Sequence, residues 1–434
     1  MKFKVVSDDT GGDLLKKAVV LGTPKYPVRA SVWFKDIKKA TAKHMRHDKV
    51  VIDTRLIEDR FVFPVAISFF RQHFVLQKYK TTLNNLDEKE CTVIVKDEKM
   101  AVEIRRRLKC QWFANRLATE PANKMYPELF CQAVKYKFRG TGARIRIMKT
   151  DELKRRGFGL ILSVGQSSVN HPPRFLIVEV GDGPRNICLV GKGVVFDSGG
   201  YNLKGSKHML NMKGDKTGGA LAVAAALYFA TSGGVDGAGF KIVALVPLVE
   251  NLIGQYAQKV GDVHTSYSGK TVEVVDTDAE GRLILADALS YASQVYKPEL
   301  LLDFATLTGW AESLHCDTSY VFYTENDKLA ASVYESGNRA GERSIRMPAW
   351  PEYMEDTVSD IADLKNSHFT SCERGGGFMA SMFLANFVKS RKSWVHFDLT
   401  HVQNKHSMMT CNGLQTIIDF VGLAMKKMIG PNGM

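Results

Sequence analysis

The stretch ICLVGKGVVFDSGG (residues 187–200) joins a short apolar run to a glycine-rich segment that holds one lysine and one aspartate. Other apolar runs of strand length lie on both sides of it, separated by segments rich in helix formers. The runs are 175–180, 187–190, 240–248, 300–305 and 394–399, and the helical segments include 221–230, 283–294 and 380–387. Continuous apolar strands that alternate with helices predict an α/β fold with a mainly parallel central sheet flanked by helices.

The first part of the chain has a different pattern. Short β-rich runs, such as 30–34 and 61–67, alternate with basic polar segments up to about residue 95. Helix formers dominate from residue 96 to residue 119, with apolar residues at helical spacing. We therefore predict a smaller basic α/β N-terminal domain at 1–95, a linker helix at 96–116, and the domain with the parallel sheet at 117–434.

Composition limits the class of protein. The 434 residues are 45% hydrophobic, and the seven cysteines, at positions 91, 110, 131, 188, 316, 372 and 411, form no CxxC pair. Such a chain can bury a large core, and its scattered cysteines argue against a disulfide framework. No apolar run reaches the roughly 20 residues of a membrane span, and the first residues lack a signal-peptide core. We expect a globular cytoplasmic protein with no membrane partner.

The net charge of +13 is concentrated near the N-terminus. Residues 1–150 carry 32 Lys and Arg against 16 Asp and Glu, whereas residues 151–434 carry 27 against 30. A basic third is compatible with nucleic-acid or other anion binding, and also with an ordinary solvated surface. We favour the solvated surface, because the densest cluster, Arg105 to Arg107 with Lys109, lies in a helical stretch without a nucleic-acid-binding motif.

Glycine-rich polar segments follow or precede several apolar elements. In open α/β sheets, ligands bind beyond the carboxyl ends of the strands, so these segments are candidate sites. The spacing of their glycines does not match a dinucleotide fingerprint or a phosphate-binding loop, and no GxSxG motif surrounds Ser198. Nucleotide binding is therefore not expected.

Four acidic residues stand in these segments: Asp197, Asp215, Asp278 and Glu280. Each one alone is typical of a helix cap or a turn. If they converge, their negative charges repel one another strongly, and two divalent cations would neutralise them. Asp278 and Glu280 are two residues apart, which in an extended segment directs both side chains to one side, and Gly281 allows close approach of the backbone. This pattern indicates a two-metal site.

Several motifs occur in the order typical of one enzyme family. They are LATEPANKMYP (117–127), VGKGVVFDSGG (190–200) with Lys204, MKGDKTGG (212–219), LVENLIG (248–254), DTDAEGRL (276–283), DFATLTG (303–309), ADLKN (362–366) and WVHFDL (394–399). Over roughly residues 105–425 the chain resembles the leucyl aminopeptidases, the M17 or cytosol aminopeptidase family. The resemblance implies that the domain at 117–434 is catalytic and releases N-terminal residues from peptides.

The resemblance also implies a set of metal ligands: Lys192, Asp197, Asp215, Asp278 and Glu280. In the family pattern the residues at Asp197 and Glu280 bridge two divalent ions, those at Lys192 and Asp215 hold the tight site, and that at Asp278 holds the exchangeable one. Zinc or manganese is the family expectation, and magnesium or cobalt also suits the donor set. Lys192 must be neutral to coordinate, and two nearby cations would lower its pKa from the usual value of about 10.4.

Further residues receive roles from the same resemblance. A hydroxide that bridges the metals would attack the peptide bond. Lys204 would polarise the scissile carbonyl, and Arg282 would hold a bicarbonate ion as proton shuttle. Met212, Thr306 and Gly309 would line an apolar pocket that prefers Leu or Met at the peptide N-terminus. The family assembles as a homohexamer, which we expect here as well.

The sequence departs from the family pattern at three places. Asp276 stands where the family usually has Asn, Thr400 and His401 replace small residues after the WVHFDL motif, and the N-terminal domain is shorter than usual. Two other functions stay open at this point. Two-metal phosphoester hydrolysis uses similar carboxylate clusters, and the basic N-terminal third could make the chain an anion- or nucleic-acid-binding protein with secondary peptidase activity.

Overall fold

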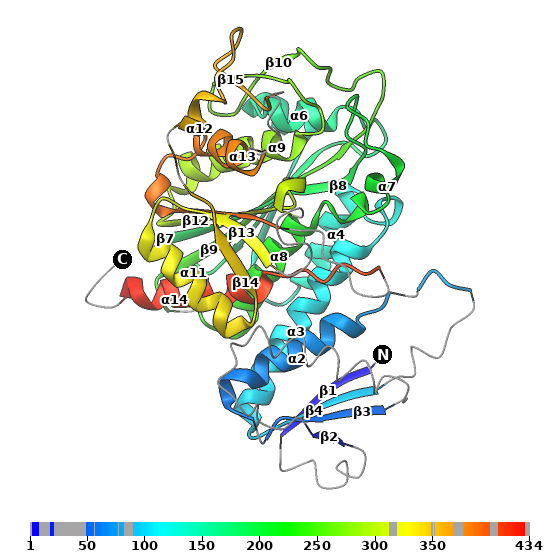
Figure 1. Ribbon diagram of the computed structural model, residues 1–434, viewed down its shortest axis with the longest axis vertical. Coiled ribbons are helices and arrows are strands. Elements are labelled where there is room, and N and C mark those ends of the chain that lie inside the picture. The colour runs from blue at the N-terminus through cyan, green and yellow to red at the C-terminus, as the bar shows by residue number, and fades with distance from the viewer. Residues whose placement is uncertain are drawn as a thin grey trace.

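Within the described residues, the computed structural model contains a four-stranded sheet (the small sheet), a nine-stranded sheet (the large sheet) and a further sheet of three short strands (Figure 1). The structure describes residues 2–7, 18–20, 49–55, 57–76, 78–81, 90–235, 237–311, 319–348, 350, 352–368, 376–399 and 407–429. The run predicted at 30–34 lies outside the described residues, as do Thr400 and His401.

The small sheet is built from the first part of the chain. Its strands are β1 (Lys2–Ser7), β2 (Ala18–Val20), β3 (Lys49–Asp53) and β4 (Glu90–Val95). They pair in the order β1-β4-β3-β2, and all three pairings are parallel. Figure 1 shows this sheet at one end of the molecule, with α2 (Asp59–His73) and α3 (Glu98–Thr119) between it and the large sheet.

Helix α2 contradicts one prediction. Residues 61–67, expected to form a strand, lie inside this helix. Val62, Val65, Ala66 and Phe69 are buried at helical spacing and belong to the core that the helix shares with the small sheet. The prediction was wrong because the β-branched and aromatic residues of this run suggested strand propensity, whereas packing at a period of 3.6 residues decides the structure.

Helix α3 is the element predicted between residues 96 and 119. Asp97 caps it by accepting a hydrogen bond from the Met100 N–H at 2.8 Å. Ile104 and Leu108 from its first half pack in the core of the small sheet, whereas Phe113 and Leu117 from its second half pack in a core of the large sheet. One helix therefore takes part in two hydrophobic cores. The domain boundaries at residues 95 and 116 stay predictions.

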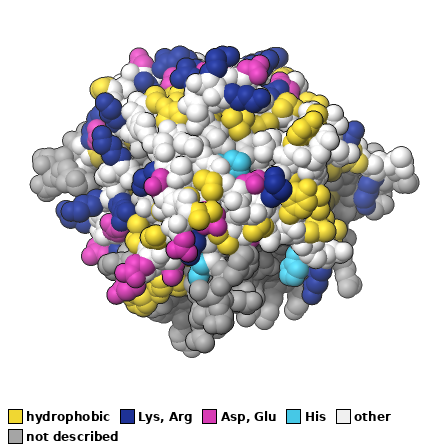
Figure 2. All heavy atoms as spheres, turned by 90° about the horizontal axis from the view of Figure 1, so that it is seen from above, with side chains coloured by type: hydrophobic (Ala, Val, Ile, Leu, Met, Phe, Trp, Pro, Cys, Tyr) yellow, Lys and Arg dark blue, Asp and Glu magenta, His cyan; other side chains and the backbone are white. Residues whose placement is uncertain are grey.

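The basic cluster on α3 is engaged in ion pairs within the chain. Arg105 pairs with Glu98, Arg106 with Glu103, and Arg107 with both Glu103 and Asp419. On the end of the molecule that carries β10 (Val263–Thr265) and β15 (Leu364–Lys365), Figure 2 shows Lys and Arg side chains interspersed with Asp and Glu. The ion pairs of Arg105, Arg106 and Arg107 favour a structural interpretation of the positive charge on α3.

Nine strands form the large sheet in the part of the chain that the structure describes. Its order is β14-β13-β16-β12-β7-β9-β6-β5, with β8 also paired to β9. The strands are β5 (Arg144–Lys149), β6 (Arg174–Val180), β7 (Arg185–Gly191), β8 (Gly193–Asp197), β9 (Phe240–Asn251), β12 (Leu300–Ala305), β13 (Ser319–Tyr323), β14 (Arg343–Arg346) and β16 (Trp394–Asp398). The central pairings β16-β12-β7-β9 and the pairing of β8 with β9 are parallel, while β5-β6, β6-β9 and β13-β16 are antiparallel.

Helices cover both faces of this sheet. The core on one face includes α4 (Pro127–Lys137), α8 (Thr217–Ser232), α11 (Asp327–Ala340) and α14 (Leu414–Ile429), and the core on the other includes α5 (Thr150–Arg156), α6 (Gly159–Gly165), α9 (Glu280–Tyr291) and α13 (Gly376–Ala385). Shorter elements are α7 (Ser206–Met209), β11 (Thr271–Glu273), α12 (Glu352–Glu355) and a π-helical turn at Ala292–Tyr296.

The apolar runs of the sequence explain this burial. Along β7, Ile187 and Leu189 pack into one core, whereas Cys188 and Val190 pack into the other, as the two-residue period of a strand requires. The predicted α/β class with a mainly parallel sheet flanked by helices is confirmed. In the part of the chain that the structure describes, no helix combines the length and apolarity needed to cross a bilayer.

A buried carboxylate ties the N-terminal part to the large sheet. Glu342 follows α11 and pairs with Arg71 of α2, and both side chains are largely inaccessible to solvent. Glu342 also accepts hydrogen bonds from the Gly413 and Thr416 N–H groups at 2.9 and 2.8 Å, and from the Thr416 hydroxyl at 2.6 Å. One side chain therefore holds both α2 and the start of α14.

We expect Glu342→Ala to lower the free energy of unfolding by about 3–5 kcal/mol, because it leaves the Arg71 guanidinium buried without its carboxylate. Glu335→Ala is the matched control, since Glu335 forms an exposed pair with Arg339 one helical turn away and should cost less than about 1 kcal/mol. Urea unfolding of both variants measures the difference, and equal midpoints would contradict the assigned role.

Candidate metal centre

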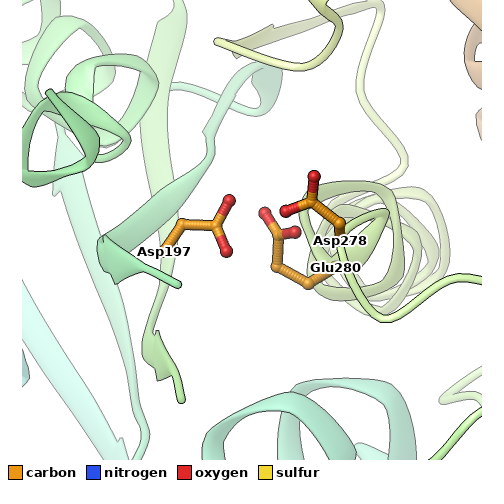
Figure 3. Close-up of side chains that lie close together, drawn as sticks. All are labelled: Asp197, Asp278 and Glu280. Atoms are coloured by element: carbon orange, nitrogen blue, oxygen red, sulfur yellow. The ribbon is translucent and has the colours of Figure 1, made fainter. Parts of the chain in front are cut away.

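Carboxylates from two separate elements face one another beyond the carboxyl end of β8. Figure 3 shows Asp197 at the end of this strand, opposite Asp278 and Glu280 at the start of α9. One oxygen from each of the three lies within 4.8 Å of the others. The structure thus brings together acids that are about 80 residues apart in the sequence.

Lys192 and Asp215 complete the cluster. Lys192 lies between β7 and β8, and Asp215 ends the 3-10 turn Met212–Gly214 just before α8. The Lys192 Nζ lies 2.7 Å from Asp215 Oδ2 and 2.9 Å from Glu280 Oε1. It also donates to the Thr306 carbonyl at 3.0 Å. The five residues predicted as metal ligands therefore lie in one continuous cluster.

Gly281 makes room for the lysine. A Cβ atom at this position would lie 2.6–2.8 Å from the last three atoms of the Lys192 side chain. A side chain larger than hydrogen would therefore displace the amine from between Asp215 and Glu280. This agrees with the close backbone approach expected at Gly281.

Lys204 occupies the other side of the cluster. Its Nζ lies 2.9 Å from Asp197 Oδ2 and 2.5 Å from Asp278 Oδ1. Burial would lower the pKa of Lys204, but the carboxylates of Asp197, Glu280 and Asp278 outweigh it and raise the pKa above its usual range. The same competition, with Asp215 as the strongest partner, raises the pKa of Lys192.

The pKa values of three of the carboxylates are raised as well, but for these groups a raised pKa means that the charged form is disfavoured. Asp215 and Glu280 are buried, and this burial together with repulsion by Asp197 raises the pKa of both groups despite the nearby Lys192. Asp278 has a raised pKa for the same reasons, with a further contribution from Glu280. When all four carboxylates are ionised, the two ammonium groups leave an excess of negative charge, which a bound cation would relieve.

One carboxylate oxygen of Glu280 lacks a hydrogen-bond donor among the described residues. This atom, Oε2, is buried. Buried carboxylate oxygens without a donor are costly. The oxygen-rich donor set and this unsatisfied atom fit a hard or borderline divalent cation.

The local structure of the second acidic segment differs from the prediction. Asp278 lies in a turn rather than in an extended segment, and Glu280 is the first residue of α9. The turn forms because the Asp276 carboxylate accepts a hydrogen bond from the Asp278 N–H at 2.8 Å. The side chains still converge on Asp197, but through turn geometry and not through the alternation of a strand.

Of the three predicted pocket residues, Thr306 contacts the cluster directly. Thr306 follows β12, is buried, and donates from its hydroxyl to Asp215 Oδ1 at 2.7 Å. Met212 is half-buried in the turn that leads to Asp215, and Gly309 is exposed at a position where an added Cβ atom would meet no atom within 4 Å beyond its chain neighbours. Thr306 is therefore part of the cluster itself, and Met212 lies three residues before Asp215 in the chain.

Arg282 lies in the first turn of α9 and is largely buried. Its Nη1 donates to the Asn366 carbonyl at 2.8 Å and contacts the Met379 sulfur at 3.1 Å. Its Nε has no hydrogen-bond partner among the described residues. Burial lowers the pKa of Arg282, against the attraction of Asp276 and Glu280.

Some residues that shape the site have no role in the sequence analysis. Asn251 donates to Asp197 Oδ1 at 2.8 Å and to the Thr277 carbonyl at 3.0 Å, so it links the two acidic segments. Asp398 accepts from the Leu307 and Thr308 N–H groups and from the Thr308 hydroxyl. Both residues occur in motifs that support the family resemblance, and a search of those motifs for buried polar residues would have found them.

Comparisons with known proteins agree with this architecture. The model of the cytosol aminopeptidase family, catalytic domain, matches residues 112–418. A probable cytosol aminopeptidase of Chlorobium phaeobacteroides is 39% identical over 67% of this chain and 57% of its own length, and one of Rickettsia canadensis is 34% identical over 82% and 72%. The chain thus spans less than three fifths of the length of the Chlorobium relative.

A solved structure shares the fold. The bottromycin maturation enzyme BotP in complex with Mn is similar with a TM-score of 0.80 and 26% identity, over 93% of this chain and 89% of that one. The match to the family model and the Rickettsia relative together establish the relationship, and the chain belongs to the cytosol aminopeptidase (M17) family.

We expect Lys192→Met to destabilise the metal-free protein by about 3–5 kcal/mol at pH 8, because it leaves buried carboxylates without their cation. The pKa is about 6 for Asp215, about 7 for Asp278 and about 8 for Glu280, so these groups are protonated at pH 5 and the loss should be much smaller there. Urea unfolding in the presence of a chelator measures this, with the exposed Lys207→Met as control. An equal loss at both pH values would contradict the expectation.

Proposed function

We propose that this protein is a metal-dependent aminopeptidase that releases N-terminal residues from peptides, with preference for Leu- or Met-like side chains. The observation that carries the proposal is the convergence of Asp197, Asp278 and Glu280 within 4.8 Å, beside the buried pair of Lys192 and Asp215. Family membership supports the reaction class, and the manganese complex of BotP supports the choice of a divalent cation.

The ligands in this proposal are Lys192, Asp197, Asp215, Asp278 and Glu280. When bound, a pair of divalent cations would supply Lewis-acid polarisation and a water nucleophile at neutral pH. Zinc and manganese are the leading candidates, and magnesium or cobalt is also compatible with the donors. The unsatisfied Glu280 Oε2 and the excess of negative charge favour cation binding. Binding would replace the ammonium contacts that balance the carboxylates in the metal-free protein.

The chain's own residues perform the remaining tasks. The acidic cluster would attract the free α-ammonium of a peptide, which explains why cleavage would be limited to the first residue. Lys204, with its Nζ beside Asp197 and Asp278, would donate to the scissile carbonyl oxygen as negative charge develops there. Arg282, whose Nε has no partner among the described residues, would hold a bicarbonate ion. Met212, Thr306 and Gly309 would line the side-chain pocket.

Location and assembly are part of the same proposal. Cys110, Cys131, Cys188 and Cys411 are buried free thiols, which suits a reducing compartment such as the cytoplasm. A homohexamer is the assembly that family membership suggests. Peptides are the proposed substrates.

Metal dependence is tested with leucine amide or a leucyl fluorogenic substrate. We expect chelation to abolish hydrolysis and Mn²⁺ or Zn²⁺ to restore it, because the ligands alone supply no nucleophile. Asp197→Ala should lose bound metal and activity together, while the exposed Glu335→Ala retains both. No turnover by folded, metal-loaded protein would reject the proposal, and turnover of p-nitrophenyl phosphate instead would indicate phosphoester hydrolysis.

Lys204→Ala separates binding from catalysis. We expect metal content to be retained and kcat to fall by about 10²–10³-fold, the usual cost of removing one donor to a developing oxyanion. Metal analysis and steady-state kinetics on the same sample check both points. Loss of metal together with activity would show that Lys204 holds the carboxylates in place and does not act on the substrate.

A further inference from the structure

The ADLKN motif (362–366) has no role in the proposed mechanism, yet its last residue, Asn366, makes several hydrogen bonds beside the cluster. Asn366 follows β15 and is fully buried. β15 pairs in parallel with β11, and the Asn366 N–H continues this ladder by donating to the Glu273 carbonyl at 3.0 Å. Asn366 is thereby placed beside the segment that leads to Asp278 and Glu280.

The side-chain amide of Asn366 binds this segment on both of its polar atoms. Its Oδ1 accepts from the Val275 and Asp276 N–H groups at 2.8 and 3.2 Å. Its Nδ2 donates to the Asp276 and Ala279 carbonyls at 2.6 and 3.3 Å. An asparagine amide offers two donor hydrogens and one acceptor oxygen with two lone pairs, so its hydrogen-bonding capacity is completely used.

Residues that end or follow β8 and β9 also bind the turn at 275–279. Asn202 Oδ1 accepts from the Thr277 N–H at 2.9 Å, and the Thr277 hydroxyl donates to the Gly199 carbonyl at 2.7 Å. Asn251 donates to the Thr277 carbonyl. Asn202, Gly199 and Asn251 thus bind Thr277, whereas Asn366 binds the backbone of Asp276 and Ala279.

A neutral amide suits this position for an electrostatic reason. Asp278 and Glu280 repel Asp197, so the turn needs attachments that resist displacement. Lysine or arginine side chains would compete with a cation for the carboxylates, whereas an amide holds the backbone and adds no charge. The backbone carbonyl of Asn366 also accepts a hydrogen bond from the Arg282 guanidinium, which places this side chain relative to the same turn.

We infer that Asn366 is a positioning residue that holds the turn 275–279 so that Asp278 and Glu280 face Asp197 at the spacing required to bind divalent cations. This inference rests on the proposed function. In this role Asn366 contacts neither the substrate nor the metal. Its effect passes through the backbone of the turn.

Asn366→Asp is the sharpest test, because the shape of the side chain is preserved while its two donors are replaced by an acceptor. The added negative charge alone would attract Mn²⁺ more strongly. We nevertheless expect the affinity for Mn²⁺ to fall by about 10–100-fold, the usual effect of removing a group that orients metal ligands. Calorimetric titration of the full-length, metal-stripped protein with Mn²⁺ measures this, and thermal unfolding with and without Mn²⁺ should show a smaller stabilisation by the metal than in the wild type.

Asn186→Asp is the matched control. Asn186 lies near the start of β7, at the end of the strand opposite Lys192, and donates to the Tyr296 carbonyl at 2.7 Å. The same substitution there adds the same charge and removes a partly buried donor far from the acidic cluster, so Mn²⁺ affinity should stay within about twofold of the wild type even if the protein melts earlier.

Three outcomes distinguish the inference from the proposed function. Wild-type protein that binds no Mn²⁺ would overturn both. Wild-type protein that binds Mn²⁺ and an Asn366→Asp variant with the same affinity would overturn the positioning role alone. If Asn366→Asp does not fold, Asn366→Ser, which removes the reach to the turn without adding charge, takes its place, and unchanged Mn²⁺ affinity in that variant would likewise overturn the role.

Discussion

Repulsion among buried carboxylates is the constraint on which the rest of the site depends. Asp197, Asp215 and Glu280 are buried and Asp278 is partly buried beyond the ends of the parallel strands, and this low solvent exposure makes their mutual repulsion strong. Two lysines reduce this repulsion by direct contact, and each has a raised pKa because several carboxylates surround it. The fold holds the carboxylates in place against the repulsion that the lysines do not remove.

Different groups supply charge and shape in this framework. Lysines neutralise, whereas the amides of Asn251 and Asn366 and the carboxylate of Asp398 bind backbone atoms of the loops that carry the site. The parallel sheet makes this possible because β7 and β12 end side by side, and β8 continues along β9 from the point where β7 ends. Loops from distant parts of the sequence can therefore be joined there by single side chains.

Much of this organisation was predictable from the sequence. Strands such as 187–190 were evident because both of their faces are buried, which leaves a continuous apolar run. The acidic cluster was evident because its members stand in glycine-rich breaks in a recognisable order. Helix α2 was missed because residues 61–67 have the composition of a strand, and the turn at Asp278 was missed because a hydrogen bond from its own backbone to Asp276 decides it. The role of Asn366 could not be predicted, since its partners lie about 90 residues away and only the pairing of β15 with β11 brings them together.

Helix α3 has a consequence for how this architecture can be modified. Because Ile104 and Leu108 insert into one core while Phe113 and Leu117 insert into the other, the two halves of the helix cannot be separated without exposing an apolar surface. Exchange of the N-terminal part with that of a relative would therefore require the junction to lie before the helix, and the incoming strands would have to fit its existing apolar face. An exchanged N-terminal part would be stable only if its apolar residues pack against Ile104 and Leu108 of α3.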